Sequence, residues 1–123
     1  MLDLKTDRIP KIWGREIIFN REPYCVKFLQ YDGVRTSSLH YHEKKHETFI
    51  ILKGLFQIEF YSLDDTSARH CDTHGPGAVV VLDPRTVHRL KCVTPEGGIV
   101  VEASSHEDPD DCVRLEPSVN PFG

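Results

Sequence analysis

The sequence predicts an all-β protein, folded as a sandwich or barrel of short strands. Its 123 residues contain about seven short runs that are rich in β-branched and aromatic residues. Glycine, proline and other turn residues separate these runs at intervals of roughly 8 to 15 residues, and no window shows the period of a long helix. Regular short strands of this kind indicate a barrel or sandwich, and the length gives room for a single domain over residues 1–123.

The expected strands fall into two halves. The first strand is Tyr24–Tyr31, which Asp32 and Gly33 close as a turn pair. The polar segment Ser62–Gly75 between the halves is predicted to be an exposed linker loop. We therefore expect an N-terminal segment over residues 1–22, a barrel over 23–103 and a C-terminal tail over 104–123. The other expected strands are Ser37–His42, Thr48–Leu52, Leu55–Tyr61, Ala78–Leu82, Val87–Val93 and Gly98–Ala103.

Composition argues against several classes of partner. The net charge is −4, from 15 basic and 19 acidic residues, and no basic stripe suited to nucleic acid is present. No apolar run approaches the ~18 residues of a membrane span, and Met1–Pro10 lacks the apolar core of a signal peptide. The four cysteines are widely spaced, which favours a reduced, cytoplasmic protein. The acidic residues at the start of the tail are predicted to form a solvated turn: Glu107, Asp108, Asp110 and Asp111.

Four residues have the types and spacing of a metal site. His40 and His42 are two apart on a predicted strand, so both side chains point to the same face. Glu47 opens the next strand and His88 begins a later one. Three imidazoles and one carboxylate suit a single divalent ion such as Zn, Mn, Fe, Ni or Co. A degenerate site that keeps these histidines as core polar residues is the alternative.

Two stretches around these residues resemble the motifs of the cupin superfamily. The stretch from Gly33 to Gly54 contains His-Tyr-His, a glutamate at position 47 and a closing glycine. The stretch from Gly77 to His88 supplies the proline and histidine of the second motif. It departs mildly from the pattern, because Arg85 or Thr86 stands where a glycine is usual and Cys92 replaces an asparagine. The resemblance implies a cupin double-stranded β-helix, which is a barrel of the jelly-roll type.

A narrower resemblance covers most of the chain. The opening Ile12-Trp13-Gly14, the Ser-Leu-His-Tyr-His stretch that ends at His42, the Thr-Val-His-Arg-Leu stretch around His88 and the tail from Asp110 to Glu116 are similar to the cupin domain of type II mannose-6-phosphate isomerases. This resemblance implies a metal-dependent, isomerase-like enzyme whose ligand is a sugar or sugar phosphate. Trp13 is expected to pack the N-terminal segment against the barrel.

Two further residues are candidates for catalysis. Lys27 can hold an anionic group or stabilise an enolate if its face of the strand points inward, and a solvent-facing lysine is the alternative. Glu102 can act as a general base if it faces the cavity, and a carboxylate at the rim is the alternative. Arg89 follows His88 directly and so is expected on the opposite face of its strand.

Two functions other than isomerisation remain open at the level of sequence. An Fe(II)-dependent dioxygenase uses similar histidine-rich sites, and a non-catalytic module that binds a sugar or another metabolite needs no chemistry at all. In each case the partner is a small molecule. Because small barrels commonly cover an exposed sheet edge by pairing, we also expect a homodimer, formed through Ala78–Leu82 or the N-terminal segment.

Overall fold

The structure is a computed structural model that describes residues 7–119. The parts of the predicted N-terminal segment and C-terminal tail that fall in residues 1–6 and 120–123 lie outside the described residues. Nearly all of its regular structure is β-strand, with one short 3₁₀ helix, η1 (Pro109–Asp111). No helix in residues 7–119 has the length and apolar character needed to cross a membrane. The strands are β1 (Asp7–Lys11), β2 (Gly14–Arg21), β3 (Tyr24–Tyr31), β4 (Arg35–Thr36), β5 (Leu39–His42), β6 (Glu47–Lys53), β7 (Phe56–Ser62), β8 (Asp65–His74), β9 (Val79–Leu82), β10 (Thr86–Cys92), β11 (Gly98–Ser105) and β12 (Cys112–Glu116).

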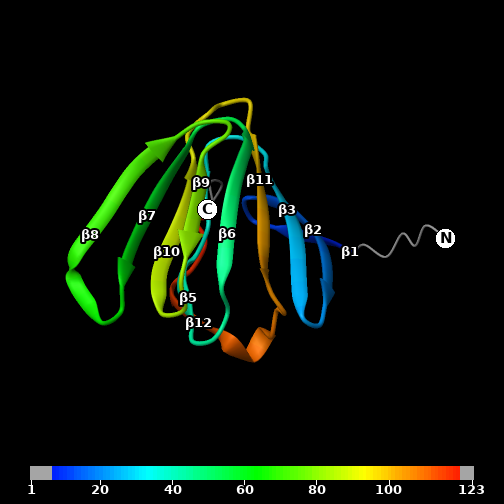
Figure 1. The fold of residues 1–123 in the computed structure, drawn as a ribbon. Helices are drawn as coiled ribbons and strands as arrows, with labels where there is room; N and C mark the ends of the chain where they lie inside the picture. Colours follow the sequence, from blue (N-terminus) through cyan, green and yellow to red (C-terminus); the bar gives the residue numbers. More distant parts are fainter. Residues whose placement is uncertain (1–6, 120–123) are drawn as a thin grey trace.

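The strands form two antiparallel sheets (Figure 1). One sheet has the order β1-β2-β3-β11-β6-β9, and the other has the order β12-β5-β10-β7-β8, with the short β4 also paired to β10. Strands that are distant in sequence are therefore neighbours, such as β3 and β11 or β5 and β10. This crossing order brings strands of both sequence halves into both sheets.

An apolar core fills one part of the space between the sheets. Phe49 and Ile51 of β6 pack with Phe56 and Ile58 of β7, as the alternation of these strands requires. Trp13 is buried and stacks on a core tyrosine, Tyr31, with 4.4 Å between ring centroids. Trp13 therefore packs the N-terminal segment against the barrel, as the sequence analysis expected.

The interior changes from apolar to charged along the same strands. The inward-facing residues of β3 run from Tyr31 and Leu29 to Lys27, and those of β11 run from Val100 to Glu102. The register pairs Lys27 with Glu102 across these two strands, so both charges face inward at the same level of the barrel. This charged half lies toward the end of the barrel that carries η1 and the loop between β5 and β6 (Figure 1).

The prediction of an exposed linker loop over Ser62–Gly75 is wrong for residues 65–74. Residues 65–74 form β8, a strand that pairs with β7 at the edge of its sheet. Almost every residue of β8 is exposed, so its two faces are equally polar and no alternation marks it in the sequence. Its backbone hydrogen bonds to β7 define the strand instead. Strands β1, β2 and β12 likewise form outside residues 23–103.

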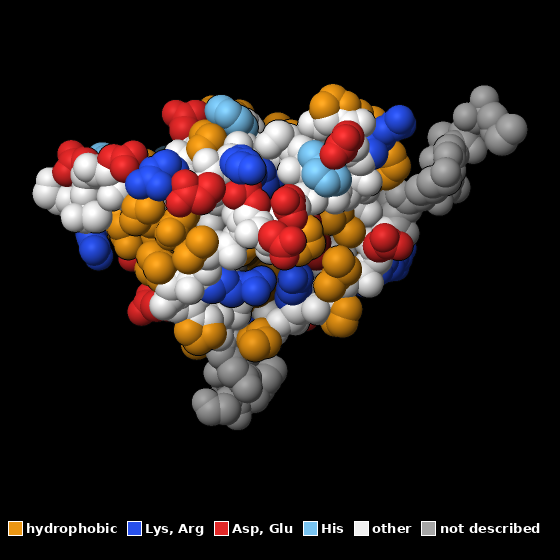
Figure 2. All heavy atoms as spheres, turned by 90° about the horizontal axis from the view of Figure 1, so that it is seen from below, with side chains coloured by type: hydrophobic (Ala, Val, Ile, Leu, Met, Phe, Trp, Pro, Cys, Tyr) orange, Lys and Arg blue, Asp and Glu red, His pale blue; other side chains and the backbone are white. Residues whose placement is uncertain are grey.

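The predicted solvated acidic turn is also wrong in part. Asp108 and Asp110 are exposed, and Asp108 caps η1 by accepting a hydrogen bond from the Asp110 N–H. However, the Asp111 carboxylate accepts hydrogen bonds from the backbone N–H groups of residues 43–45, and Glu107 makes ion pairs with interior lysines. The tail therefore closes one end of the barrel. Figure 2 views that end from below and shows acidic and basic side chains interspersed across its middle.

Candidate metal centre

Three histidines meet in the interior of the barrel. His40 and His42 lie on β5, and His88 lies directly opposite His40 on the neighbouring β10. The ring centroids of His40 and His88 are 4.5 Å apart, and those of His40 and His42 are 5.2 Å apart. One nitrogen atom of each ring lies within 4.8 Å of the others, so the three can hold one metal ion. Two-residue spacing on one strand and direct pairing with the next strand produce this arrangement.

The main chain fixes which ring nitrogen faces inward. Nδ1 of His40 lies 3.1 Å from the carbonyl oxygen of Ser38, and Nδ1 of His88 lies 2.9 Å from that of Thr86. Nδ1 of His42 lies 3.1 Å from the carbonyl oxygen of Asp111. A carbonyl oxygen only accepts hydrogen bonds, so each Nδ1 carries a proton and Nε2 is the ring nitrogen that faces the centre. Metal-binding histidines are oriented in this way by their outer partners.

The burial of these rings also favours metal binding. Burial lowers the pKa of His40 well below its usual value, and burial likewise lowers the pKa of His88. The Nε2 atom of His88 is buried and makes no hydrogen bond among the described residues, although the acceptor oxygen Oε2 of Glu47 lies 3.2 Å from it. An orphaned nitrogen of this kind costs free energy unless something binds it, and a metal ion would satisfy it.

Glu47, at the start of β6, lies beside two of these histidines. Its Oε1 lies 3.4 Å from Nε2 of His42, and its Oε2 lies 3.2 Å from Nε2 of His88. Burial would raise the pKa of Glu47, but the neighbouring His42, His88 and Lys45 outweigh burial and hold the pKa below its usual range. The Glu47 carboxylate is ionised, and Nε2 atoms that have lost their protons would add three electron pairs beside it. Such a group of donors fits a cation at its centre.

Lys45 was not predicted to belong to the site, yet it connects the centre to the rest of the interior. Its side chain is 1% exposed although it comes from a loop between strands. Its Nζ lies 3.2 Å from Glu47 Oε1, 2.8 Å from Glu102 Oε2 and 3.2 Å from Glu107 Oε1. Burial would lower the pKa of Lys45, but the surrounding carboxylates outweigh burial and raise it. Lys45 is therefore charged.

Lys27 and Glu102, the two predicted catalytic residues, both face inward and lie beside each other. Lys27 Nζ is 3.9 Å from Glu102 Oε2 and 3.4 Å from Glu16 Oε1, and it also contacts Glu107. Burial raises the pKa of Glu102, and the charge of Glu47 adds to this effect. Glu102 is connected to the three histidines by a chain of contacts: it pairs with Lys45, Lys45 pairs with Glu47, and Glu47 lies beside two of the rings.

The charges in this cluster do not balance. Three ammonium groups, those of Lys11, Lys27 and Lys45, lie within 4.0 Å of four carboxylates: Glu16, Glu47, Glu102 and Glu107. With all of these groups ionised the formal charge of the cluster is −1, in a region where unbalanced charge is costly. A cation beside the imidazoles would offset this negative charge. The donor atoms, the orphaned His88 nitrogen and this charge all fit the same ion.

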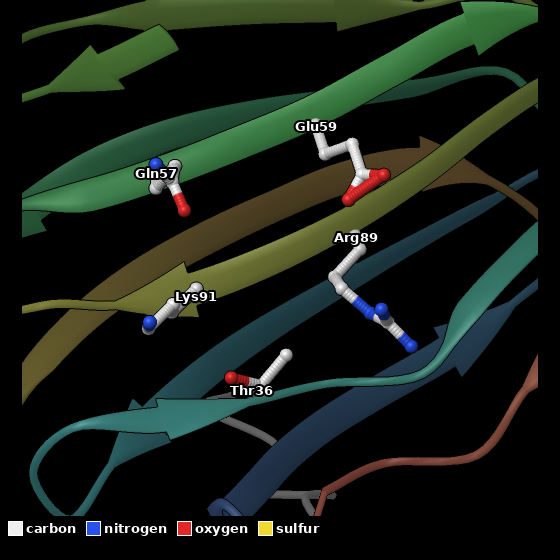
Figure 3. Close-up of a pocket in the computed structure, with 5 residues that line it drawn as sticks. All are labelled: Thr36, Gln57, Glu59, Arg89 and Lys91. Carbon is white, nitrogen blue, oxygen red and sulfur yellow. The ribbon is translucent and has the colours of Figure 1, made fainter. Parts of the chain in front are cut away.

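The remaining polar candidates lie elsewhere. Arg89 points to the outer face of its sheet, as strand alternation predicted, into a hollow of about 220 Å³ (Figure 3). There it forms an ion pair with Glu116, with 3.1 Å between Nη1 and Oε2. His70 lies on β8 and stacks on Phe60 with 4.8 Å between ring centroids, so it takes no part in the metal centre.

Comparison with known proteins supports the fold. Neither a protein-family model nor a curated protein sequence matches this chain. Among solved structures, the capsular polysaccharide assembling protein CapF from Staphylococcus aureus is similar with a TM-score of 0.80 and 18% identity over 93% of this chain. Oxalate decarboxylase from Bacillus subtilis is similar with a TM-score of 0.78 and 14% identity over 89% of this chain. The matched regions make up 35% and 30% of those proteins, so this chain spans about a third of their length.

These likenesses define the class of the fold. The chain is an all-β protein with the cupin double-stranded β-helix fold, as its two motifs predicted. His40, His42 and His88, which those motifs supplied, are the group that can hold a metal ion.

Proposed function

We propose that this chain is a metal-dependent cupin that acts as an isomerase on a sugar or sugar phosphate. The observation that carries the proposal is Glu102, a buried carboxylate with a raised pKa that lies one ammonium group away from the metal-binding set. A general base works best when its pKa lies near the operating pH, and burial moves Glu102 in that direction. The similarity to a protein of capsular polysaccharide assembly is consistent with a carbohydrate ligand.

His40, His42, Glu47 and His88 would hold the metal ion. An ion in that position would act as a Lewis acid toward a carbonyl or hydroxyl oxygen. Glu102 would take a proton from the carbon beside the carbonyl and return it to the former carbonyl carbon, while the proton of the adjacent hydroxyl group passes to the former carbonyl oxygen. The carboxyl group of Glu102 ends the reaction unprotonated. Lys27 and Lys45, both within 4 Å of Glu102, would hold its carboxylate in place.

A second candidate is a non-catalytic module that binds a sugar or another metabolite. One observation favours it, because Lys27 and Glu102 are each already engaged in ion pairs. Groups locked in this way support a rigid binding site as readily as a catalytic one. An Fe(II)-dependent dioxygenase would use the same three histidines and carboxylate, and the identity of the metal separates it from Lewis-acid chemistry.

The isomerase is tested by incubating the metal-loaded protein with hexose and pentose phosphates in D₂O. We expect deuterium to enter the product at the carbon beside the carbonyl. Glu102→Gln should lower kcat by roughly 10²–10⁴-fold, since it removes the general base. The metal content of this variant should be unchanged. Glu59→Gln, which removes a carboxylate from the outer face, should leave kcat as in the wild type.

The absence of exchange and turnover with all of these substrates, or a fully active Glu102→Gln variant, would show the isomerase to be wrong. Calorimetric binding of a sugar phosphate without any chemical change would then favour the binding module. Oxygen uptake that depends on iron would instead favour the dioxygenase.

A further inference from the structure

One segment of the tail closes the charged end of the barrel. We call residues 105–111, which connect β11 to β12, the strap (Figure 1). At its start, the Ser105 hydroxyl accepts a hydrogen bond from the backbone N–H of His46 at 3.1 Å. At its end, the Asp111 carboxylate accepts hydrogen bonds of 3.0–3.2 Å from the N–H groups of Glu43, Lys44 and Lys45. Both ends are thus fixed to the loop that carries Lys45.

Glu107 is the residue of the strap that enters the interior. Its backbone is held by Asn20, because the Asn20 amide donates to the Glu107 carbonyl and accepts from the Glu107 N–H, both at 3.0 Å. Its side chain contacts the ammonium groups of Lys27 and Lys45 through the same oxygen, Oε1. Burial would raise the pKa of Glu107, but the two lysines outweigh burial and lower it. The carboxylate is therefore ionised where it meets them.

Glu107 differs from the other carboxylates of the cluster in two ways. Glu16, Glu47 and Glu102 belong to sheet strands and are almost completely buried. The Glu107 side chain is 22% exposed, whereas those of Lys27 and Lys45 are 7% and 1% exposed. Among the carboxylates that pair with Lys27 or Lys45, Glu107 is therefore the one most exposed to solvent. Its side chain can rotate outward without breaking the backbone hydrogen bonds to Asn20.

We propose that Lys27 and Lys45 form an oxyanion-binding subsite that takes the carboxylate or phosphate group of the substrate, and that Glu107 fills this subsite until the substrate displaces it. The inference rests on the proposed function, since the ligand is the substrate of the same centre. A ligand oxyanion would replace the Glu107 charge, so the balance of the cluster would be kept. Lys27 keeps Glu16 and Glu102 as partners when Glu107 moves out, and Lys45 keeps Glu47 and Glu102, so the exchange leaves neither ammonium group unpaired.

The experiment measures anion binding rather than turnover. Inorganic phosphate and acetate are each titrated into the metal-loaded protein by calorimetry. An internal carboxylate competes at an effective concentration in the millimolar range or above, so we expect Glu107→Gln to bind at least one of the two anions at least tenfold more tightly than the wild type. The anion with the larger gain identifies the ligand group. Adding Lys27→Gln to Glu107→Gln should abolish the gain.

Asp110→Asn is the matched control, because it removes one charge from an exposed position of the same strap. An equal gain in Asp110→Asn would overturn the proposal, since net charge alone would then explain it. Binding in Glu107→Gln no tighter than in the wild type would also overturn it, as would a gain that survives Lys27→Gln. If Glu107→Gln does not fold, Glu107→Asp withdraws the carboxylate by one methylene group and should show a smaller gain of the same kind; no gain in that variant would overturn the proposal.

The test separates this proposal from the proposed isomerase. Tighter anion binding in Glu107→Gln without turnover of any sugar phosphate would support the subsite and leave the isomerase without support. Turnover by the wild type with no change in anion binding would do the reverse.

Discussion

Backbone carbonyl groups determine the orientation of all three histidines. Ser38 supplies its oxygen from the segment before β5, Thr86 from β10 and Asp111 from the strap, so three separate elements aim the rings at one point. Side-chain substitutions nearby leave these acceptors in place, and for His40 the Ser38 hydroxyl adds a side-chain contact, with Oγ 2.9 Å from Nδ1. The histidine geometry is therefore a property of the backbone, whereas the electrostatic balance of the site depends on Lys45 and the carboxylates around it.

The balance of charge predicts a large loss of stability for Lys45→Met. This change leaves Glu47 and Glu102 buried beside each other without the ammonium group between them. Removing one partner of a buried ion pair typically costs about 3–5 kcal/mol of the free energy of unfolding. Urea denaturation of the chelator-treated protein measures it. The neighbouring Lys44 is exposed, so Lys44→Met should cost less than about 0.5 kcal/mol; equal losses in the two variants would contradict the account.

The histidines also predict how stability depends on pH. Burial lowers the pKa of His40 and His88 in the folded state, whereas an unfolded histidine titrates near ~6.5. The unfolded state therefore binds protons first as the pH falls. The stability that these residues contribute is present above about pH 6.5 and is lost as the pH falls toward their lowered values.

Urea unfolding of the metal-free protein at pH 7.0 and 5.5 measures this dependence. Between these pH values we expect the free energy of unfolding of the wild type to fall by about 2 kcal/mol, because each histidine contributes up to ~1.4 kcal/mol per pH unit. The fall should be smaller in His40→Asn/His88→Asn, which lacks both groups. The double variant keeps Glu102, whose raised pKa works in the opposite direction. The same slope in both proteins would contradict the assignment to the histidines.

At the scale of the elements, the alternation of inward-facing and outward-facing side chains explains which strands and which site residues could be predicted. The β3 strand was predicted with its observed limits, and the inward positions of β5 and β10 placed His40, His42 and His88 together. Alternation fails where an element has no buried face, as in β8, or where a residue lies in a loop. Lys45 is such a residue, because its burial depends on contacts with β6, β11 and the strap that no local pattern records.

Some residues were within reach of prediction. Glu16 shares the inward face of β2 with Ile18, and the two-residue period of that strand would have placed it inside. The sequence left open whether the side chains of Lys27 and Glu102 face the interior or the solvent, because the alternation within a single strand does not say which of its faces is buried. Their direct pairing across β3 and β11 decides both at once.

The free edge of β9 leads to a prediction about association. β9 is the last strand of its sheet, and its Val79 and Val81 are 59% and 67% exposed. We expect a homodimer through this edge, so Val81→Lys should yield a monomer in sedimentation experiments with its thermal midpoint nearly unchanged. Val113→Lys places the same charge on β12, the edge of the other sheet, and should leave the dimer intact. A dimer that persists in Val81→Lys would show that the copies meet elsewhere.

For the whole molecule, the decisive feature is the division of the interior into an apolar half and a charged half. The apolar half accounts for folding through ordinary burial, from Trp13 and Tyr31 to Phe56 and Ile58. The charged half carries a formal charge of −1 beside three imidazoles. The cupin motifs predicted the imidazoles, but only the three-dimensional arrangement reveals the uncompensated charge, because its members come from strands and loops that are far apart in sequence.

The central claim is that this interior is built to hold one divalent metal ion, and metal content tests it most directly. The untagged protein is purified without added metal and analysed by mass spectrometry, with His40→Ala/His42→Ala as the control. We predict about one ion per chain in the wild type and none in the double variant. A wild-type protein that contains no metal and binds none on titration, or a double variant that retains the same amount, would contradict the account.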